Sequence, residues 1–143
     1  MNNEDYASYE LALKLKACGF NEPCIAQWAC EPDGKPMLFG STAFVFSNAE
    51  LKGRDVTAPL LYHAQKWLRE VKGIAINVIA HDASDKYREG KYHWMEVHLP
   101  NSNENGSQWV DWFIYGKHPL FNTYEEALSD GLSQMLELIK KGE

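Results

Sequence analysis

The sequence predicts an α+β fold in which helices pack on an antiparallel sheet. Apolar residues recur at helical spacing near both ends of the chain and in its middle, and three strand-like runs follow one another at residues 74–81, 91–99 and 107–116. The connections between these runs, of about nine and seven residues, are shorter than a parallel crossover needs. We therefore expect an antiparallel meander, the element order α-β-β-α-β-β-β-α, and a two-layer sandwich of helices on a sheet.

A helix and a hairpin are predicted first. Ser8 is suited to cap the helix and Gly19 to end it, and between them apolar residues recur at helical spacing: Leu11, Ala12, Leu15 and Cys18. The stretch that follows predicts a β-hairpin, because Pro32 and Gly34 stand where a tight turn favours them. Residues 41–56 are expected to form a connection, within which "AFVF" has the composition of a short edge strand.

A second helix is predicted from its apolar stripe and its end signals. Thr57 or Ala58 is expected to start this helix, Pro59 lies in its first turn, and Gly73 is expected to end it. Between these positions apolar residues repeat every three or four residues: Leu60, Leu61, Ala64, Trp67, Leu68 and Val71.

The last helix is expected to begin at Thr123, which with Glu126 forms a capping box. Its apolar stripe contains Ala127, Leu128, Leu132, Met135, Leu136 and Ile139. No linker composition interrupts the chain, so residues 1–143 are expected to form a single domain. Within it, a helix plus hairpin covers 8–40 and a helix–meander–helix covers 57–140.

The composition indicates a folded protein and disfavours one class of partner. The chain has 143 residues, of which 45% are hydrophobic, and this excludes a disordered chain. Twenty acidic and fourteen basic side chains give a net charge of −6, and no more than two basic residues are adjacent. Because phosphate-binding surfaces are basic, nucleic acid is disfavoured as a partner.

The sequence also predicts a cytoplasmic protein. The opening "MNNEDYASYE" lacks the basic and apolar regions of a signal peptide, and no apolar run approaches the roughly 18 residues that span a membrane. The three cysteines, Cys18, Cys24 and Cys30, form neither a C-x-x-C motif nor an even set, so reduced, partly buried thiols are expected. Cys24 and Cys30 have the same parity and are expected to face the same way on one strand.

No motif in the chain predicts catalysis. G-x-S-x-G, the P-loop and G-x-G-x-x-G are absent, so no catalytic residue and no cofactor are expected. His81 and His118 are expected near one end of the sheet, where Asp82 would join them as a third metal ligand. Turn formation accounts for Asp82 better, and the spacing does not demand a metal.

Three segments carry a resemblance to a known group of proteins: "YELALKLKACGF", "APLLYHAQKWLREVKGIAINV" and "YEEALSDGLSQMLELI". Over residues 6 to 140 the chain resembles a family of short uncharacterised proteins encoded in prophages and mobile elements of gut Bacteroidetes-type bacteria. The resemblance implies a phage-like accessory protein, and it assigns no activity and no catalytic residue.

Alternation along the meander predicts one unusual sheet face. In "HWMEVH", His93 and His98 point to opposite sides of a strand and so do not share a metal. His93, Met95, Val97 and Leu99 are expected to face the helices together with Ile74, Ile76 and Val78. A hairpin that keeps apolar sets together places His98 opposite Trp109 and leaves a second face of aromatic and acidic side chains: Trp94, Glu96, Trp109, Asp111 and Phe113.

Two functions follow as hypotheses from that face. The face is expected to be covered, by the first helix, by the hairpin or by a second subunit. Cover by a second subunit is the favoured form, and it predicts a protein that acts through protein–protein contacts, as a homo-oligomer or with another protein. If the face is open, Trp94, Glu96, Trp109 and Asp111 form a binding module for a small molecule or carbohydrate. Opposed carboxylates on Glu96 and Asp111 would repel unless a cation, an arginine or a shared proton lay between them.

Overall fold

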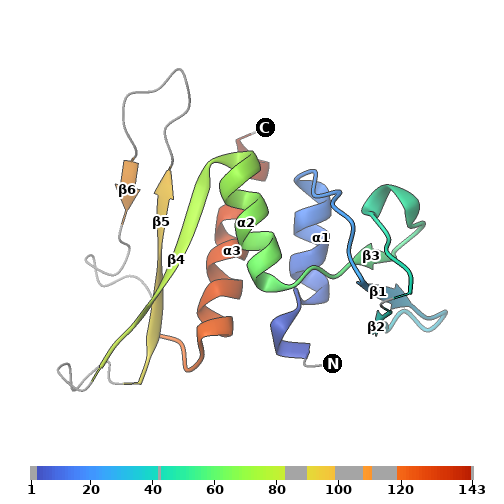
Figure 1. Cartoon of the computed structure of the whole chain (residues 1–143), viewed down its shortest axis with the longest axis horizontal. Coiled ribbons are helices and arrows are strands. Elements are labelled where there is room, and N and C mark those ends of the chain that lie inside the picture. Colours follow the sequence, from blue (N-terminus) through green and yellow to red (C-terminus); the bar gives the residue numbers. More distant parts are fainter. Residues whose placement is uncertain (1–2, 42, 83–89, 99–107, 111–118, 143) are drawn as a thin grey trace. The chain divides into compact units, whose positions relative to one another are not determined.

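The computed structural model describes residues 3–41, 43–82, 90–98, 108–110 and 119–142, and of residues 108–110 it describes the backbone. Within these ranges it contains three α-helices and two antiparallel sheets, which confirms the α+β class. The elements, in chain order, are the 3₁₀ turn Asn3–Asp5, α1 Tyr9–Ala17, β1 Ala26–Cys30, β2 Pro36–Gly40, the 3₁₀ turn Asn48–Glu50, β3 Val56–Thr57, α2 Leu61–Lys72, β4 Ile74–Ala80, β5 Tyr92–His98, β6 Gln108–Val110 and α3 Tyr124–Lys141 (Figure 1).

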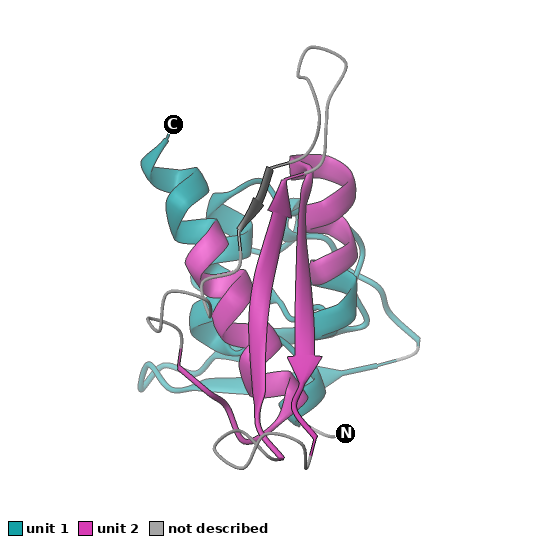
Figure 2. Ribbon diagram, turned by 90° about the vertical axis from the view of Figure 1, so that its left-hand side faces the viewer, with its two compact units in different colours: residues 1–64, 136–143 teal, residues 65–135 magenta. Residues whose placement is uncertain are grey.

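The chain divides into two compact units, which Figure 2 distinguishes by colour. Unit 1 comprises residues 1–64 and 136–143, and unit 2 comprises residues 65–135. The helices α2 and α3 each run from one unit into the other, so the boundaries fall inside helices. The expectation of one domain over 1–143 stays a prediction.

In unit 1, α1 has the start and the stop that its sequence predicts. The Ser8 hydroxyl accepts a hydrogen bond from the Leu11 amide at 3.2 Å, which satisfies one of the amide groups left open at a helix start. Gly19 follows the helix with φ 96°, a backbone conformation that costs glycine little. Leu11, Ala12 and Leu15 are buried in the core of this unit.

The predicted hairpin is present as β1 and β2, which pair antiparallel from Ala26↔Gly40 to Cys30↔Pro36. At its tip the Gly34 amide donates to the Glu31 carbonyl at 2.8 Å, and Gly34 has φ 87°. A third strand, β3, pairs with the other side of β1 and gives the sheet order β2-β1-β3. The strand β3 was not predicted from the sequence.

The start predicted for the second helix is wrong by three or four residues. Thr57 is a β3 residue opposite Gln27, and its amide donates to the Asn48 side-chain oxygen at 2.9 Å. The helix α2 begins at Leu61, after Pro59. The segment "AFVF" is not a strand either, because its only bridge joins Phe46 to Cys24.

Unit 2 contains the predicted antiparallel meander, with β5 between β4 and β6. The parts of α2 and α3 in this unit lie on one side of that sheet, as expected for two layers (Figure 1). Gly73 has φ 73° between α2 and β4, and the Thr123 hydroxyl accepts from the Glu126 amide at 3.1 Å at the start of α3. Both predicted helix-end signals are therefore confirmed.

Candidate functional site

The two faces of β5 are the reverse of those predicted. Residues that stand opposite one another in antiparallel strands share a face, and the register pairs Ile76 with Glu96 and Val78 with Trp94. The helix-covered face therefore carries Trp94 and Glu96 beside Ile76. The exposed fractions of Trp94 and Glu96 are 2% and 4%, so neither side chain is part of an open platform.

Trp94 is held against α3 by one polar and one close apolar contact. Its indole N–H donates to the Asp130 carboxylate at 2.9 Å. One residue further along α3, a Cβ on Gly131 would lie 3.0 Å from the Trp94 ring and 2.8 Å from Ile76 Cγ2. The missing side chain of Gly131 therefore makes room for the indole. A glycine inside the predicted helix stripe was the sequence signal for this close approach.

The predicted pairing of β5 with β6 is displaced by one residue. The register pairs Glu96 with Val110 and Val97 with Trp109, instead of His98 with Trp109. Because a shift of one residue exchanges the faces of a strand, Trp109 is not in the row of Glu96. Asp111 and Phe113 lie outside the described residues. The structure thus pairs the backbone of Trp109 with Val97 instead of His98.

Glu96 has a partner other than the one predicted for it. Its carboxylate lies 2.8 Å from His98 Nε2, two residues further along β5 on the same face. The Glu96 side chain is buried, whereas that of His98 is 44% exposed. A buried carboxylate needs such a partner, because an isolated buried charge is strongly unfavourable.

The structure brings His81 together with His93, a pair that the sequence did not predict. His81 Nε2 lies 2.6 Å from His93 Nδ1, and the two rings stack with centroids 4.7 Å apart. His93 stands opposite Ile79, on the face away from α3, where the sequence analysis had not placed it. His118 lies outside the described residues. Among the described residues, no group of three or more His, Cys, Asp or Glu side chains is arranged to hold a metal ion.

The expectation of reduced thiols is confirmed. Cys18 and Cys24 are buried, Cys30 is half-buried, and none of the three forms a disulfide bond. Burial raises the pKa of the Cys24 thiol to about 11, with a smaller opposing effect of the Thr57 hydroxyl. Cys24 precedes β1, so it does not share that strand with Cys30 as predicted. The Cys30 thiol lies 3.3 Å from the Tyr9 hydroxyl, and this contact is the largest cause of a raised Tyr9 pKa.

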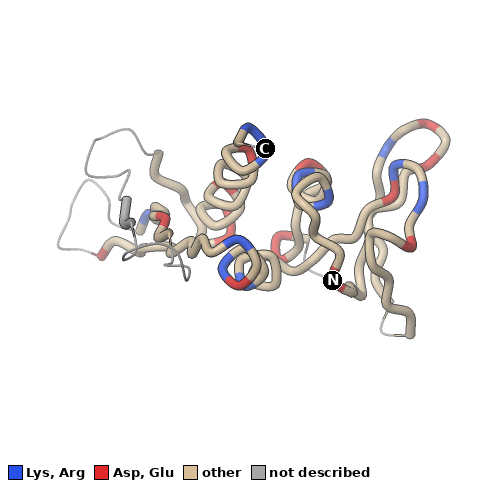
Figure 3. Tube along the Cα trace, turned by 90° about the horizontal axis from the view of Figure 1, so that it is seen from above, with Lys and Arg blue, Asp and Glu red and all other residues tan. Residues whose placement is uncertain are grey.

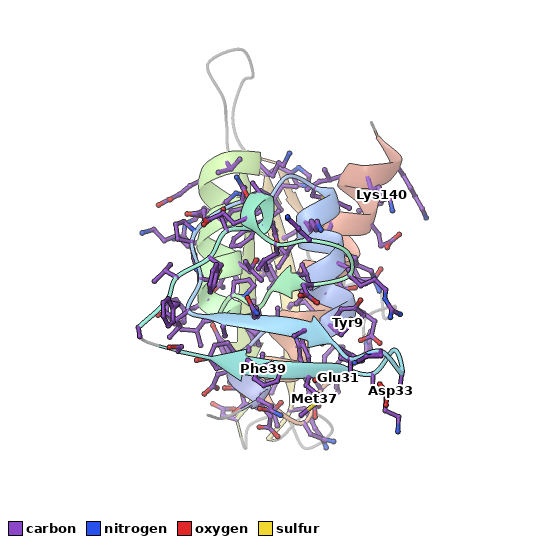
Figure 4. The ribbon with its side chains drawn as sticks, turned by 90° about the vertical axis from the view of Figure 1, so that its right-hand side faces the viewer. Tyr9, Glu31, Asp33, Met37, Phe39 and Lys140 are labelled. Carbon is purple, nitrogen blue, oxygen red and sulfur yellow. The ribbon has the colours of Figure 1, made fainter. Side chains whose placement is uncertain are left out.

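The most exposed apolar cluster of unit 1 lies on and beside the hairpin. The face of β1 that carries Trp28 lies toward the start of α1, because the Trp28 indole N–H donates to the Ala7 carbonyl at 2.8 Å. Met37 and Phe39 lie on the opposite face of the sheet, where they are 49% and 46% exposed. Figure 4 shows both residues on β2, with Glu31 and Asp33 at the hairpin turn.

Residues 44–46 add further exposed apolar side chains at the start of β1. Phe44 is 64% exposed and its ring stacks on Phe46 with centroids 6.4 Å apart. The backbone of Phe46 exchanges hydrogen bonds of 2.8 and 3.0 Å with Cys24, which ties the segment to the chain just before β1. We call the cluster the hairpin patch and define it as Ile25, Met37, Phe39, Phe44, Val45 and Phe46.

The sequence analysis assigned no site residue to the hairpin patch. The sequence signal was the stretch "PMLFG", a strand segment that contains no charged residue on either face. Edge strands of stable monomers usually carry charges or other features that block further pairing.

Comparison with known protein families, with curated proteins and with solved structures found no match for this chain. In the part of the chain that the structure describes, none of the helices has the length and apolar character to cross a membrane.

Proposed function

We propose that this protein is a non-enzymatic, cytoplasmic accessory protein of phage or mobile-element type that acts through protein–protein contacts. The observation that carries the proposal is the hairpin patch, a group of exposed apolar side chains within residues 25–46. Exposed apolar groups of this kind on small domains mark contact surfaces. The resemblance to proteins of prophages and mobile elements supports the accessory role.

The structure of the hairpin supports this use of the patch. Trp28 and the Ala7 carbonyl anchor the covered face of the sheet, so Met37 and Phe39 are presented on a supported strand. A supported surface loses less conformational entropy on binding than a loop does. Aromatic residues and methionine are also the side chains enriched in protein interfaces.

The alternative of a small-molecule or carbohydrate module is less well supported. That hypothesis used Trp94 and Glu96 as exposed groups, and both are buried against α3 and the neighbouring strands. The hairpin patch, in contrast, has the exposed aromatic rings of Phe39, Phe44 and Phe46.

The test compares wild-type protein with the double variant Met37→Lys/Phe39→Lys. The control is Val71→Lys, which places one lysine at an apolar residue that is 60% exposed on α2. Light scattering measures the mass of each chain in solution. Each chain is also immobilised and exposed to an extract of the producing cell. Every protein that is retained is then purified, and its binding to wild type, to the double variant and to Val71→Lys is measured separately.

We expect wild type and Val71→Lys to associate with similar affinity, either with a second copy of the chain or with a purified partner. The affinity of the double variant for the same association should be lower by about tenfold or more. The proposal fails if every association of wild type persists in the double variant. It also fails if wild type forms none.

A further inference from the structure

The open edge of β2 allows the partner to be named. The sheet order β2-β1-β3 leaves β2 at the border, and within the described residues of unit 1 no strand pairs with its outer side. Unpaired backbone groups along a sheet edge form a template for another strand. This inference rests on the proposed function, since it specifies what the hairpin patch contacts.

Hydrogen bonds at both ends of the hairpin fix which backbone groups of β2 point toward β1. The Ser41 amide donates to the Ile25 carbonyl at 2.9 Å, and the Glu31 amide donates to the Lys35 carbonyl at 3.3 Å. In antiparallel pairs, hydrogen-bonded and non-hydrogen-bonded positions alternate. Met37 and Phe39 therefore direct their backbone groups toward β1.

The outward groups of β2 belong to the even-numbered residues. Leu38 and Gly40 each present an N–H and a C=O, whereas Pro36 presents only a C=O because proline has no amide hydrogen. This pattern is complementary to itself. In an antiparallel pair centred on Leu38, the two Leu38 residues exchange both bonds, and each Gly40 amide donates to the Pro36 carbonyl of the other copy. The missing amide hydrogen of Pro36 therefore costs this register only one possible hydrogen bond at each end.

The side chains agree with the same register. Met37 of one copy stands opposite Phe39 of the other, so apolar residues meet apolar residues across the junction. Lys35 stands opposite Ser41, which avoids a like-charge contact. Figure 3 shows charged residues in the hairpin turn and in the connection after residue 42, while β2 itself has none.

We propose that a second copy of this chain binds the β2 edge, and that the two β2 strands pair antiparallel about a two-fold axis through Leu38. The sheet then continues as β3-β1-β2 of one copy followed by β2-β1-β3 of the other. The Met37 and Phe39 side chains of the two copies then lie next to one another on one face of the joined sheet.

The first test uses a matched pair of variants, Gly40→Pro and Gly40→Ala. The Gly40 amide points away from β1, so proline removes an inter-chain donor and leaves the β1–β2 pairing intact. Alanine keeps the donor. In sedimentation measurements over a concentration series, we expect Gly40→Pro to weaken self-association about tenfold or more and Gly40→Ala to stay near wild type.

A second measurement fixes the register without relying on proline. In a Cys30→Ser background, one chain carries Met37→Cys and another carries Phe39→Cys. Non-hydrogen-bonded cross-strand pairs bring Cβ atoms to about 4.5–5.5 Å, close to the separation that a disulfide needs. Under mild oxidation we expect covalent dimers to accumulate in the mixture and far less in either chain alone.

The outcomes separate this inference from the proposed function. Equal association of Gly40→Pro and wild type, with no mixed cross-link, overturns the β2 pairing. If Met37→Lys/Phe39→Lys still abolishes binding to a purified partner in that case, the proposed function stands. A wild-type chain that is monomeric at every concentration also overturns the inference, and an extended peptide of another protein is then the occupant to test.

Discussion

At the scale of single residues, Gly131 is a position of close packing in unit 2. A Cβ there would lie 2.8 Å from Ile76 Cγ2 and 3.0 Å from two atoms of the Trp94 ring. Ile76 is branched at Cβ and has few alternative rotamers. The ring is also fixed by its hydrogen bond to Asp130. Neither neighbour has an easy way to move aside.

We therefore expect Gly131→Ala to lower the free energy of unfolding by up to about 2 kcal/mol, since overpacking costs about 1–3 kcal/mol and the gain in helix propensity offsets about 1 kcal/mol of that cost. Urea denaturation measures the change. Gln134→Ala, at an exposed position of the same helix, is the control and should leave stability within about 0.5 kcal/mol. A stabilised Gly131→Ala protein would contradict the close packing of Trp94.

Cys24 gives a prediction on pH dependence. Its pKa is raised from 9.0 to about 11 by burial, so the folded protein holds the thiol proton more tightly than the unfolded chain does. The contribution of this group to stability is full below pH 9 and is lost as pH rises from 9 toward 11. Between pH 8 and 10.5, the urea midpoint should fall more in wild type than in Cys24→Ala. Equal falls in the two proteins would contradict the raised pKa.

At the scale of secondary-structure elements, local signals in the sequence predicted most of the fold. Ser8 and Thr123 accept hydrogen bonds from the helix amides that their positions suggested. Gly34 and Gly73 have the positive φ angles expected at a turn and a helix end. Each of these features is decided within a few residues, so a single sequence contains the information. The helices, the hairpin and the meander were predictable for this reason.

The faces of β5 were not predictable in the same way. Both alternating sets of this strand contain large apolar residues, Trp94 in one and Met95 in the other, and both of these residues are buried. The choice between the sets depends on the register with β4 and on Gly131 of α3, which are contacts distant in sequence. The pairing with β6 moved by one residue, and one residue is enough to exchange faces.

The short strand β3 illustrates a related limit. Thr57 has the residue type and the neighbouring proline of a helix start, and local rules place it there. A contact from the Asn48 side chain to its amide, together with pairing to β1, holds it in a strand instead. The candidate site was missed for the opposite reason. Met37 and Phe39 were in a correctly predicted hairpin, but their exposure depends on which face Trp28 turns toward α1.

At the scale of the whole molecule, the charge of the chain sets the conditions under which two copies associate. Each copy carries a net charge of −6, so two approaching copies repel one another. The β2 edge itself contributes no charged residue to oppose this repulsion. Apolar contacts and backbone hydrogen bonds, which depend little on ionic strength, supply the attraction in the proposed pair.

We therefore expect self-association to strengthen when salt is raised from about 20 to 200 mM, because the screening length falls from tens of ångströms to roughly 10 Å or less. Sedimentation equilibrium would show a dissociation constant several-fold lower at the higher salt concentration. Gly40→Pro is the control, since its mass should show little change over the same range. Attraction between opposite charges has the reverse salt dependence, so a dissociation constant that rises with salt would place the contact on the charged helices or loops instead of the β2 edge.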